Sequence, residues 1–479
     1  MDAYVFTFVS AQDPHLREEI QGSDNIVVDQ HIRNMNRTWG LHAKWGTNYD
    51  FNSDNSLGFS YALTRYFYDK GHSIEASQDV MKNGNPIGHI DHDYTSDGLV
   101  GPNHEANAYY IGKLGKLGID LNMTYLWNKN NENKLSKETS LQLHSQNVTT
   151  HHAQNNRLAA GKLLLSYPLW KGTINMGTEL TSTYSKGEYR NDEGIVKSTS
   201  TEIKERNAAG FAECQLTFGN LSANAGLRYE HVVSDYYEQG AWQKGPSRRY
   251  SDWFPSLSLA WHKGKWGLQG SYVYKTKRPS YGMLSNEVQY DNRYFYEGGN
   301  PYLRPEMVKS LSLMANYAWL SAEVGHEYTK DVMLWTATLY NGQDIGFSRN
   351  LNFDSFQYLY ASIVASPKFG CYQPTYELNF SRQHLDAKGY GSGKNMNKPN
   401  FFFSLRNRFS FPHDFTVYVN FRHSFGEDDG FNHMSPTSNL GLQLMKQFCN
   451  KAWTVKLFVN DLLKTNEVKS YTYADRVNL

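Results

Sequence analysis

With 479 residues, 15% of them aromatic, and a mean hydropathy of only −0.64, the chain combines many large rings with a predominantly polar composition. No run of about 18 apolar residues occurs in it, so transmembrane helices are excluded. The formal net charge of +1, from 48 basic and 47 acidic residues, provides no overall field that would attract nucleic acid or an acidic partner. Alternating strands with one face against an apolar phase and the other against water would produce this composition.

The N-terminal residues from Tyr4 to Val9 are apolar and aromatic, but Asp2 precedes them and no basic segment does. We therefore interpret them as a strand rather than as a secretory signal, and we expect any export signal to lie outside this sequence. The three cysteines, Cys214, Cys371 and Cys449, are odd in number and far apart. This spacing argues against a disulfide framework and against a CxxC metal site.

Apolar and polar residues alternate with period two in stretch after stretch, most clearly from Leu221 to Glu230. Helical spacing fits none of these stretches, so each is predicted to be a strand with one apolar face. In chain order, the apolar faces comprise Ile119, Leu121, Met123 and Tyr125; Leu221, Ala223, Ala225, Leu227 and Tyr229; Leu257, Leu259 and Trp261; Leu311, Leu313, Ala315 and Tyr317; Phe415, Val417, Val419 and Phe421; and Trp453, Val455, Leu457 and Val459.

The connections between these strands alternate between short and long. Short turns are predicted at 51–55, 115–118, 168–172, 219–220, 263–265, 367–368, 411–414 and 449–451. Long polar connections are predicted at 69–104, 128–154, 186–206, 238–248, 277–305, 386–398 and 426–437. Such a one-sided asymmetry is typical of a transmembrane β-barrel with short periplasmic turns and long extracellular loops, and not of a soluble sandwich or propeller.

Strand length and the chemistry of the polar faces favour the same architecture. Stretches such as 401–411 and 415–425 have about 11 residues, the length that a tilted transmembrane strand needs. We count about nineteen strands and expect about 22 in the full protein, so a large all-β antiparallel barrel is predicted. A water-filled or plug-filled lumen would solvate the charges on the polar faces, which are Asp120, Glu179, Arg228, Glu230, Glu377, Arg406, Arg408, Arg422 and Lys456.

The segment at 277–306 carries the most specific sequence signal. Its residues Gly299-Asn300-Pro301-Tyr302-Leu303-Arg304-Pro305-Glu306 follow Arg278-Pro279 and lead into a predicted strand. They resemble the pattern Gly-Asn-Pro-x-Leu-(basic)-Pro-Glu of the Bacteroidetes-type outer-membrane β-barrel family, a group of TonB-dependent receptor barrels. The stretch at 459–466, which includes Asn460 and Asp461, is similar to the end of that family's penultimate strand.

The resemblance implies that residues 1–479 form an outer-membrane β-barrel domain, incomplete because the N-terminal plug and the final strand lie outside this sequence. It implies a receptor in the outer membrane of a Gram-negative cell that binds a metal chelate, a cobalamin-like compound, a glycan or a peptide for energised uptake. The implied partners are outer-membrane lipid, the plug domain, the TonB complex, the nutrient and a surface lipoprotein. The alternatives are a passive or structural barrel without TonB coupling and a soluble secreted glycan-active β protein.

Within the segment at 277–306, we interpret the family motif as structural, because glycine and proline shape the backbone and offer few polar contacts. The motif residues are Arg278, Pro279, Gly299, Asn300, Pro301, Leu303, Pro305 and Glu306, together with Asn460 and Asp461 near the end of the chain. Rings that could stack on a ligand, and one basic residue beside them, are the candidates for ligand contact: Tyr281, Tyr294, Tyr296, Tyr302 and Arg304.

No catalytic, metal or cofactor site is predicted. The group His89, Asp91, His92 and Asp93 has residue types that bind metals, but its spacing matches no known signature, so we interpret it as part of a hydrated loop. No nucleophile elbow, phosphate-binding loop or pair of glycosidase carboxylates stands out. The protein is therefore not expected to be an enzyme or to bind nucleic acid.

Overall fold

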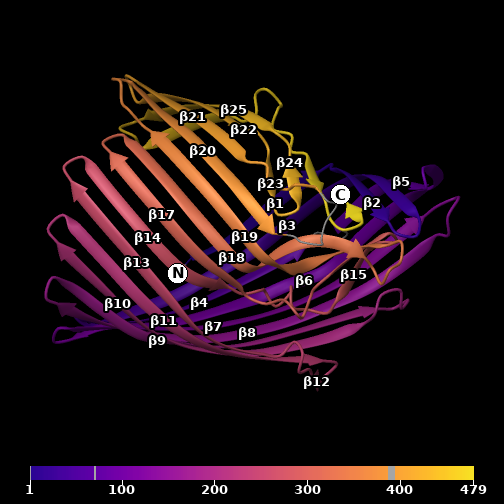
Figure 1. Ribbon diagram of the computed structural model, residues 1–479, viewed down its shortest axis with the longest axis horizontal. Helices are drawn as coiled ribbons and strands as arrows, with labels where there is room; N and C mark the ends of the chain where they lie inside the picture. The colour runs from indigo at the N-terminus through magenta and orange to yellow at the C-terminus, as the bar shows by residue number, and fades with distance from the viewer. Residues whose placement is uncertain (1, 69–71, 387–393) are drawn as a thin grey trace.

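The computed structural model describes residues 2–68, 72–386 and 394–479, and in these ranges every regular element is a β-strand. None of it contains a helix that could cross a membrane. Nineteen strands, each antiparallel to the next, form the wall of a barrel (Figure 1), which confirms the predicted fold class. The wall strands are β1 (Asp2–Gln12), β3 (Asn25–Asn52), β4 (Asn55–Tyr68), β6 (Asn85–Leu114), β7 (Leu117–Thr139), β8 (Gln146–Leu169), β9 (Gly172–Asn191), β10 (Thr199–Phe218), β11 (Leu221–Glu238), β13 (Arg248–Lys263), β14 (Trp266–Lys277), β17 (Glu306–Tyr317), β18 (Leu320–Leu339), β19 (Gly346–Ala365), β20 (Tyr372–Asp386), β21 (Asn400–Phe411), β22 (Phe415–Ser424), β25 (Thr437–Phe448) and β26 (Trp453–Val459).

The remaining strands extend or line the wall at one end of the barrel. β2 (His15–Gln21) and β5 (His72–Lys82) both pair with the first part of β3, beyond the places where β1 and β4 pair with it. The others are short: β12 (Ala241–Trp242), β15 (Val288–Asn292), β16 (Phe295–Gly298), β23 (Glu427–Asp429), β24 (Asn432–Met434), β27 (Ser470–Thr472) and β28 (Val477–Asn478).

The two ends of the barrel, which we call the turn end and the loop end, differ as predicted. At the turn end, β6 and β7 are joined by residues 115–116, and β10 and β11 by residues 219–220. At the loop end, however, much of the chain predicted as loop is strand. The stretch predicted as a loop at 69–104 contains β5 and most of β6. Residues 69–71 of this stretch, and residues 387–393 of the loop predicted at 386–398, lie outside the described ranges.

These strand extensions have a physical reason, because the wall continues past the apolar phase. Beyond that phase the outer face of a strand meets water, while the inner face packs against other protein segments and buries polar Gln78 and His92 as well as Val80 and Ile90. The apolar alternation is therefore interrupted in the sequence while the backbone pairing continues. Asp79 is paired with His89 between β5 and β6, and Glu138 with Gln146 between β7 and β8. At the loop end, β5–β6 and β7–β8 are therefore long hairpins with short tips.

The predicted apolar faces point away from the lumen. Leu227, Leu313 and Leu457 are 46%, 57% and 62% exposed, as expected of side chains that face lipid rather than a core. Large exposed rings also gather at the turn end, where they suit the aromatic girdle of a membrane interface. They include Trp170, Trp266, Trp319 and Trp453.

Inside the loop end, a buried apolar cluster joins elements from distant parts of the wall. Each fully buried aliphatic or aromatic side chain of this kind stabilises the fold by about 1.5–3 kcal/mol. The loop end is therefore a packed structure rather than an open mouth. The cluster comprises Ile20, Ile26, Val28, Val80, Ile90, Phe295, Ala337, Ala474 and Val477.

The wall has two edges in the part of the chain that the structure describes, since no backbone pairing joins β1 to β26. The edges are β1 and β26. The C-terminal residues after β26 cross the gap between these two edges at the loop end. There β28 pairs with β2, and the backbone nitrogen of Gln21 donates to the carbonyl of Arg476 at 2.8 Å. We propose that the final strand expected from the sequence would pair with the two edges.

Candidate ligand-binding site

Residues 278–305, between β14 and β17, fold back into the loop end, and we call them the cross-lumen loop. Within them β15 pairs with β16, and β16 pairs in parallel with β19. On the opposite side, the hydroxyl of Tyr290 donates to Glu138 of β7 at 2.6 Å. The loop therefore spans the lumen between distant strands of the wall (Figure 1).

The start of the cross-lumen loop is fixed to the wall by Arg278 of the family motif. Its guanidinium donates to Glu230 on β11, whose other carboxylate oxygen accepts from Arg228 at 2.5 Å. Arg228 also contacts Glu179 on β9 at 3.3 Å. Glu179, Arg228 and Glu230 are among the residues predicted from the sequence to face the lumen. Their mutual pairing offsets the free energy lost when these charges are removed from water.

The Gly-Asn-Pro part of the motif packs against backbone. A Cβ atom at Gly299 would lie 2.2 Å from the carbonyl oxygen of Ser285, so no larger residue fits without a shift of the chain. The backbone nitrogen of Asn300 donates to the carbonyl of Met283 at 2.7 Å, and its side-chain oxygen accepts from the backbone nitrogen of Tyr302 at 3.1 Å. These contacts determine the shape of the loop.

The end of the motif is similarly tied to its surroundings. Leu303 is fully buried beside Met333, whose backbone nitrogen donates to Glu306 at 2.7 Å. Arg248 of β13 donates to the carbonyl of Pro301 at 2.6 Å. In these contacts the motif residues meet other parts of the chain, which supports our proposal that the motif is structural.

The second motif, Asn460-Asp461, lies directly after β26 and forms a turn. The carboxylate of Asp461 accepts hydrogen bonds from the backbone nitrogens of Thr465 at 3.0 Å and Asn466 at 3.4 Å. Asp461 has φ of 52°, in the left-handed region that aspartate tolerates in turns. We propose a structural role for this motif as well.

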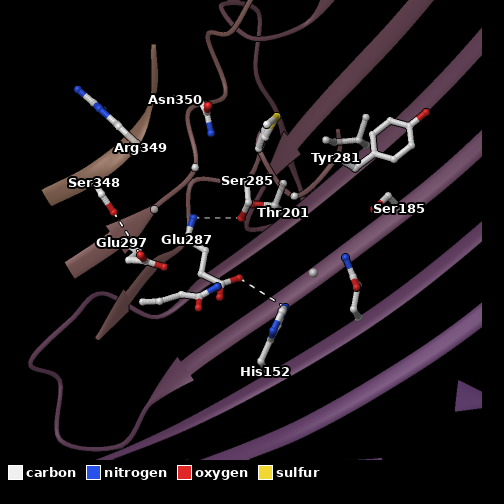
Figure 2. A pocket seen from close by; sticks show the side chains of 18 of the residues that line it. His152, Ser185, Thr201, Tyr281, Ser285, Glu287, Glu297, Ser348, Arg349 and Asn350 are labelled. Carbon is white, nitrogen blue, oxygen red and sulfur yellow. Dashed lines mark hydrogen bonds and ion pairs between the residues drawn. The ribbon is translucent and has the colours of Figure 1, made fainter. Parts of the chain in front are cut away.

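A pocket of about 320 Å³ lies between the cross-lumen loop and the inner face of the wall (Figure 2). Side chains of β8, β9 and β10 form one side, the cross-lumen loop forms the second, and β18 and β19 form the third. Two rings, those of Tyr281 and Trp335, border it. The rest of the lining is mainly polar and includes His152, Gln154, Ser185, Thr201, Ser285, Glu287, Gln289, Glu297, Ser348, Arg349 and Asn350.

Glu287 is the charged residue that most distinguishes this pocket. It is only 7% exposed, and one of its carboxylate oxygens lies 3.6 Å from Nε2 of His152. The other oxygen, Oε1, is buried and has no hydrogen-bond partner. Burial raises the pKa of the Glu287 carboxyl, and the neighbouring His152 acts in the opposite direction. A ligand group that donates a hydrogen bond or carries positive charge would satisfy this oxygen.

Across the pocket, β19 directs Ser348 toward the cavity and Arg349 away from it (Figure 2). The Nε atom of Arg349 on β19 is also buried without a hydrogen-bond partner, while its guanidinium lies 5.4 Å from the ring centre of Phe347. Beside it, the hydroxyl of Ser348 donates to Glu297 at 3.5 Å. The pocket therefore presents one unsatisfied acceptor among several hydroxyl and amide groups, a lining that suits a ligand with hydrogen-bond donors.

The sequence pattern of the outer membrane protein beta-barrel family matches residues 112–478. The chain belongs to this family. No curated protein matches it. Membership in this family places the barrel in the outer membrane, which confirms the predicted location and excludes a soluble secreted protein. The loop end of the barrel is therefore its extracellular end.

Solved structures share the fold of this outer-membrane barrel at low sequence identity. The copper transporter OprC has a TM-score of 0.62 at 10% identity, over 96% of this chain and 76% of that one. The FrpB iron transporter from Neisseria meningitidis has a TM-score of 0.58 at 11% identity, over 99% and 77%. The alcaligin outer-membrane receptor FauA from Bordetella pertussis has a TM-score of 0.54 at 11% identity, over 99% and 74%.

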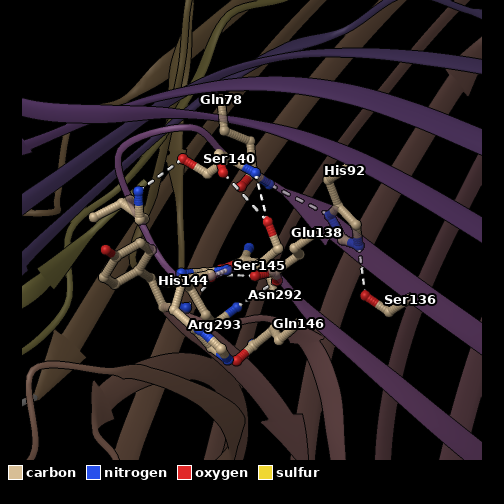
Figure 3. A network of polar contacts seen from close by, with 12 residues as sticks. Gln78, His92, Ser136, Glu138, Ser140, His144, Ser145, Gln146, Asn292 and Arg293 are labelled. Carbon is tan, nitrogen blue, oxygen red and sulfur yellow. Dashed lines mark hydrogen bonds and ion pairs between the residues drawn. The ribbon is translucent and has the colours of Figure 1, made fainter.

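A second polar network in the outer-membrane barrel holds the far side of the cross-lumen loop (Figure 3). Glu138 of β7 is its centre and accepts from Tyr290, whose hydroxyl in turn accepts from the amide of Gln146 at 2.5 Å. The guanidinium of Arg293 donates to the carbonyl of His144 at 2.8 Å. Polar groups from three segments are thus satisfied inside the extracellular end.

The candidate metal ligands at 89–93 lie on β6 rather than in a loop, and they point to opposite faces of it. His89 pairs with Asp79 at 2.8 Å, whereas His92 is buried and hydrogen-bonded to Ser136 at 2.6 Å. Burial lowers the pKa of His92. In the described part of the chain, no three His, Cys, Asp or Glu side chains converge as a metal site would require.

The predicted ligand-contact residues are separated by the fold. Tyr281 borders the pocket, and its hydroxyl donates to Glu205 at 3.2 Å. Tyr302 is 65% exposed, and the adjacent Arg304 pairs with Asp331 at 2.6 Å. We therefore keep Tyr281 as a candidate for the pocket, and Tyr302 and Arg304 as candidates at the surface of the loop.

The other two candidates are less accessible than the sequence suggested. Tyr296 is buried, with its ring centre 5.1 Å from that of Tyr340 and in the same cluster as Phe347. Clustered aromatic residues thus pack the loop on itself here, and ligand contact by Tyr296, which would require this cluster to open, stays a prediction. Tyr294 is half-buried against the apolar cluster around Phe295.

Sequence reasoning did not single out Glu287, His152, Glu297 or Arg349. Each is an isolated polar residue in its own stretch, and they meet only through the position of the cross-lumen loop across the lumen. One signal was present, since an acidic residue followed by a short alternating stretch, Val288 to Asn292, indicates a strand inside the loop. Nothing in the local sequence indicates what that strand faces.

Proposed function

We propose that this barrel is the membrane-spanning part of an outer-membrane receptor that binds a nutrient at its extracellular end for energised uptake. The observation that carries the proposal is the pocket beneath the cross-lumen loop, where Oε1 of Glu287 is buried without a partner. A buried carboxylate oxygen without a hydrogen-bond partner lowers the stability of the fold. Its presence in a lumen pocket is therefore best explained by a ligand that donates a hydrogen bond to it.

The pocket chemistry narrows the ligand classes expected from the sequence. A volume of about 320 Å³ is at the lower end of small-molecule sites, so the pocket fits a small ligand or one arm of a larger one. Its many hydroxyl and amide groups favour an organic ligand with several hydrogen-bonding groups. Because no metal-binding group occurs among the described residues, a chelate, a glycan or a peptide is better matched than a bare ion.

Proteins of similar fold support the receptor class. They include a copper transporter, an iron transporter, an alcaligin receptor and a hemophore receptor in complex with its hemophore and heme. We extend from them only the general role, which is capture and passage of a scarce compound. Coupling to a TonB complex through a plug domain, and assistance by a surface lipoprotein, are further parts of the proposal.

The alternative, a passive barrel without TonB coupling, receives less support. The cross-lumen loop and the apolar cluster around Phe295 pack the extracellular end, and passive diffusion would need a route around them. An energised receptor has a reason to keep this end closed until a ligand binds, because closure prevents leakage of other solutes.

The complete gene product, purified from outer membranes in detergent, provides the test. Binding of a ferric hydroxamate chelate, heme, cyanocobalamin, maltoheptaose and a tetrapeptide would be measured by calorimetry for the natural protein and for Glu287→Gln. We expect one probe to bind and the substitution to weaken it at least tenfold, because an amide replaces the acceptor only in part. Uptake of that probe by cells should stop when a protonophore is added. Swelling of liposomes by all small solutes, with no probe bound, would favour the passive barrel instead.

A further inference from the structure

The outward face of the wall carries a recess of about 870 Å³ that crosses β4 to β11 and is separate from the lumen pocket. Its floor consists of small residues, and larger apolar side chains rise beside it. The small residues are Ala106, Ala108, Ala159, Gly161, Ser182 and Ala208. The larger ones include Phe59, Met123, Tyr125 and Leu180.

Strand register shows that this recess faces lipid. Met123 pairs with Gly161, Gly161 with Leu180, and Leu180 with Ala208, so these four side chains share one face of the sheet. Met123 and Leu180 are 51% and 57% exposed, while the adjacent Glu179 points into the lumen toward Arg228. A Cβ atom at Gly161 would meet nothing within 4 Å, which confirms open space above the floor.

The recess runs obliquely across the membrane. Phe59 lies four positions from Asn55, the first residue of β4 at the turn end, whereas Arg206 lies twelve positions from Phe218, the last residue of β10 at that end. With a rise of about 3.3 Å per residue and a tilt of about 45°, these positions are about 9 Å and about 28 Å above the turn end. The apolar band of such barrels is about 25 Å tall, so the recess ends at the extracellular interface.

Basic residues lie at this upper end. Arg206 and His231 both line the recess and are exposed, and Arg206 has no ion pair or hydrogen bond with any described residue. Its acidic neighbour Asp235 is already paired with Arg249 at 2.8 Å. Two strands away, on β8, the guanidinium of Arg157 lies 5.9 Å from the ring centre of Tyr184 and is likewise exposed. Asp235 also attracts Arg206, but this carboxylate is shared with Arg249, so the interface end of the recess has more basic than acidic groups.

We propose that this recess is a binding site for a phosphorylated lipid of the surrounding outer leaflet. An acyl chain lies along the small-residue floor, where Gly161 and Ala208 leave room for it, and the phosphate of the head group contacts Arg206 and His231. Apolar contact along the chain and charge pairing at its head act together, and charge pairing is stronger at an interface than in bulk water. The bound lipid would be retained with the barrel rather than exchange freely.

Native mass spectrometry of the complete protein, released from a mild detergent, would test the site. The probes are a bis-phosphorylated lipid A and the same glycolipid with its phosphates removed, so that the acyl chains are matched. We expect at least tenfold preferential retention of the phosphorylated form. Arg206→Gln should remove most of this preference while weak binding of both forms persists.

A second pair of variants separates the apolar part of the site from general effects on folding. Gly161→Trp fills the recess and should reduce the retention of both lipids at least fivefold. Ala361→Trp, on the lipid-facing side of β19 between Leu359 and Ile363, is the matched control and should leave retention unchanged. Heat-modifiable mobility on a gel confirms that each variant is folded. Equal retention of both lipids by the natural protein and by all variants would overturn the proposal, as would a dimer that only Gly161→Trp abolishes.

Discussion

Arg293 in the cross-lumen loop and Glu138 on β7 form a buried ion pair, with Nε 2.5 Å from Oε2, although 155 positions separate them in the chain. The backbone nitrogen of Arg293 donates to the same carboxylate at 3.0 Å. The Glu138 side chain is completely buried, so the pair is shielded from water and salt. This contact holds the loop against the wall on the side opposite β19.

Substitution of Glu138 by alanine should release this side of the loop. It leaves the Arg293 guanidinium largely buried without its partner, which costs about 3–5 kcal/mol for a pair of this kind. We expect the detergent-solubilised protein to lose its folded gel mobility at a lower temperature. Single-channel recordings in planar bilayers should show a larger conductance, because the loop no longer packs across the lumen.

A matched control is the exposed pair Arg190–Asp192 at the tip of the next hairpin, with Nε 3.0 Å from Oδ1. Solvent already screens these charges, so Arg190→Ala should change neither the unfolding temperature nor the conductance. If Glu138→Ala and Arg190→Ala behave alike, the buried pair does not hold the loop.

Substitution of Gly299 by alanine tests whether the family motif shapes the backbone. The new Cβ would lie 2.2 Å from the carbonyl oxygen of Ser285 and 3.0 Å from that of Gly282, and backbone atoms cannot move aside cheaply. We expect a loss of about 1–3 kcal/mol in the free energy of unfolding. Gly210→Ala is the control, since its Cβ meets nothing within 4 Å and alanine should be neutral or slightly stabilising there. Chemical denaturation in detergent would measure both, and equal effects would refute the packing role of Gly299.

The sequence was sufficient for the wall of the barrel but not for its interior. Alternation such as that from Leu221 to Tyr229 is imposed by lipid on one side and water on the other, so it is visible residue by residue. The strands at the extracellular end have no lipid on their outer face and bury both polar and apolar side chains on their inner face, so their alternation is weak and stretches such as 69–104 are predicted as loops. Tyr290, Phe295 and Tyr296 lie close together in the sequence, but their burial depends on wall residues more than a hundred positions away.

The candidate site illustrates the same limit. Arg278 and Gly299 could be identified because they belong to a contiguous motif whose spelling is specific. His152 could not, because it meets Glu287 only after the strands acquire their register and the loop crosses the lumen. A long connection that contains its own alternating strand, like β15, is nevertheless an indication that a predicted loop folds inward.

The stability of the extracellular end should decrease as pH rises. Burial, with Asp291 as the next largest cause, raises the pKa of Glu18 from 4.5 to about 8, and burial also raises that of Glu287. The folded state therefore binds more protons than the unfolded state between about pH 4.5 and pH 8, so the stabilisation is complete at low pH and is lost through this window. Each such group contributes a slope of up to about 1.4 kcal/mol per pH unit.

The variant Glu18→Gln isolates this effect. Glutamine has the same shape and can still accept the hydrogen bond from Gln30, but it has no ionisable carboxyl group. We expect its unfolding temperature in detergent to depend less on pH between 5 and 8 than that of the natural protein. A steeper dependence, or stability that increases with pH in both proteins, would contradict the assignment.

Two adjacent residues, Tyr302 and Leu303, should separate ligand binding from folding. Leu303 is fully buried beside Ile203, Tyr236 and Met333, so Leu303→Ala should cost about 2–5 kcal/mol and lower the unfolding temperature. Tyr302 is 65% exposed, so Tyr302→Ala should leave the unfolding temperature nearly unchanged. If Tyr302 contacts the ligand at the surface of the loop, its removal weakens binding of the probe that calorimetry identifies. Unaltered affinity in Tyr302→Ala would restrict ligand contact to the pocket beneath the loop, where Tyr281 and Glu287 lie.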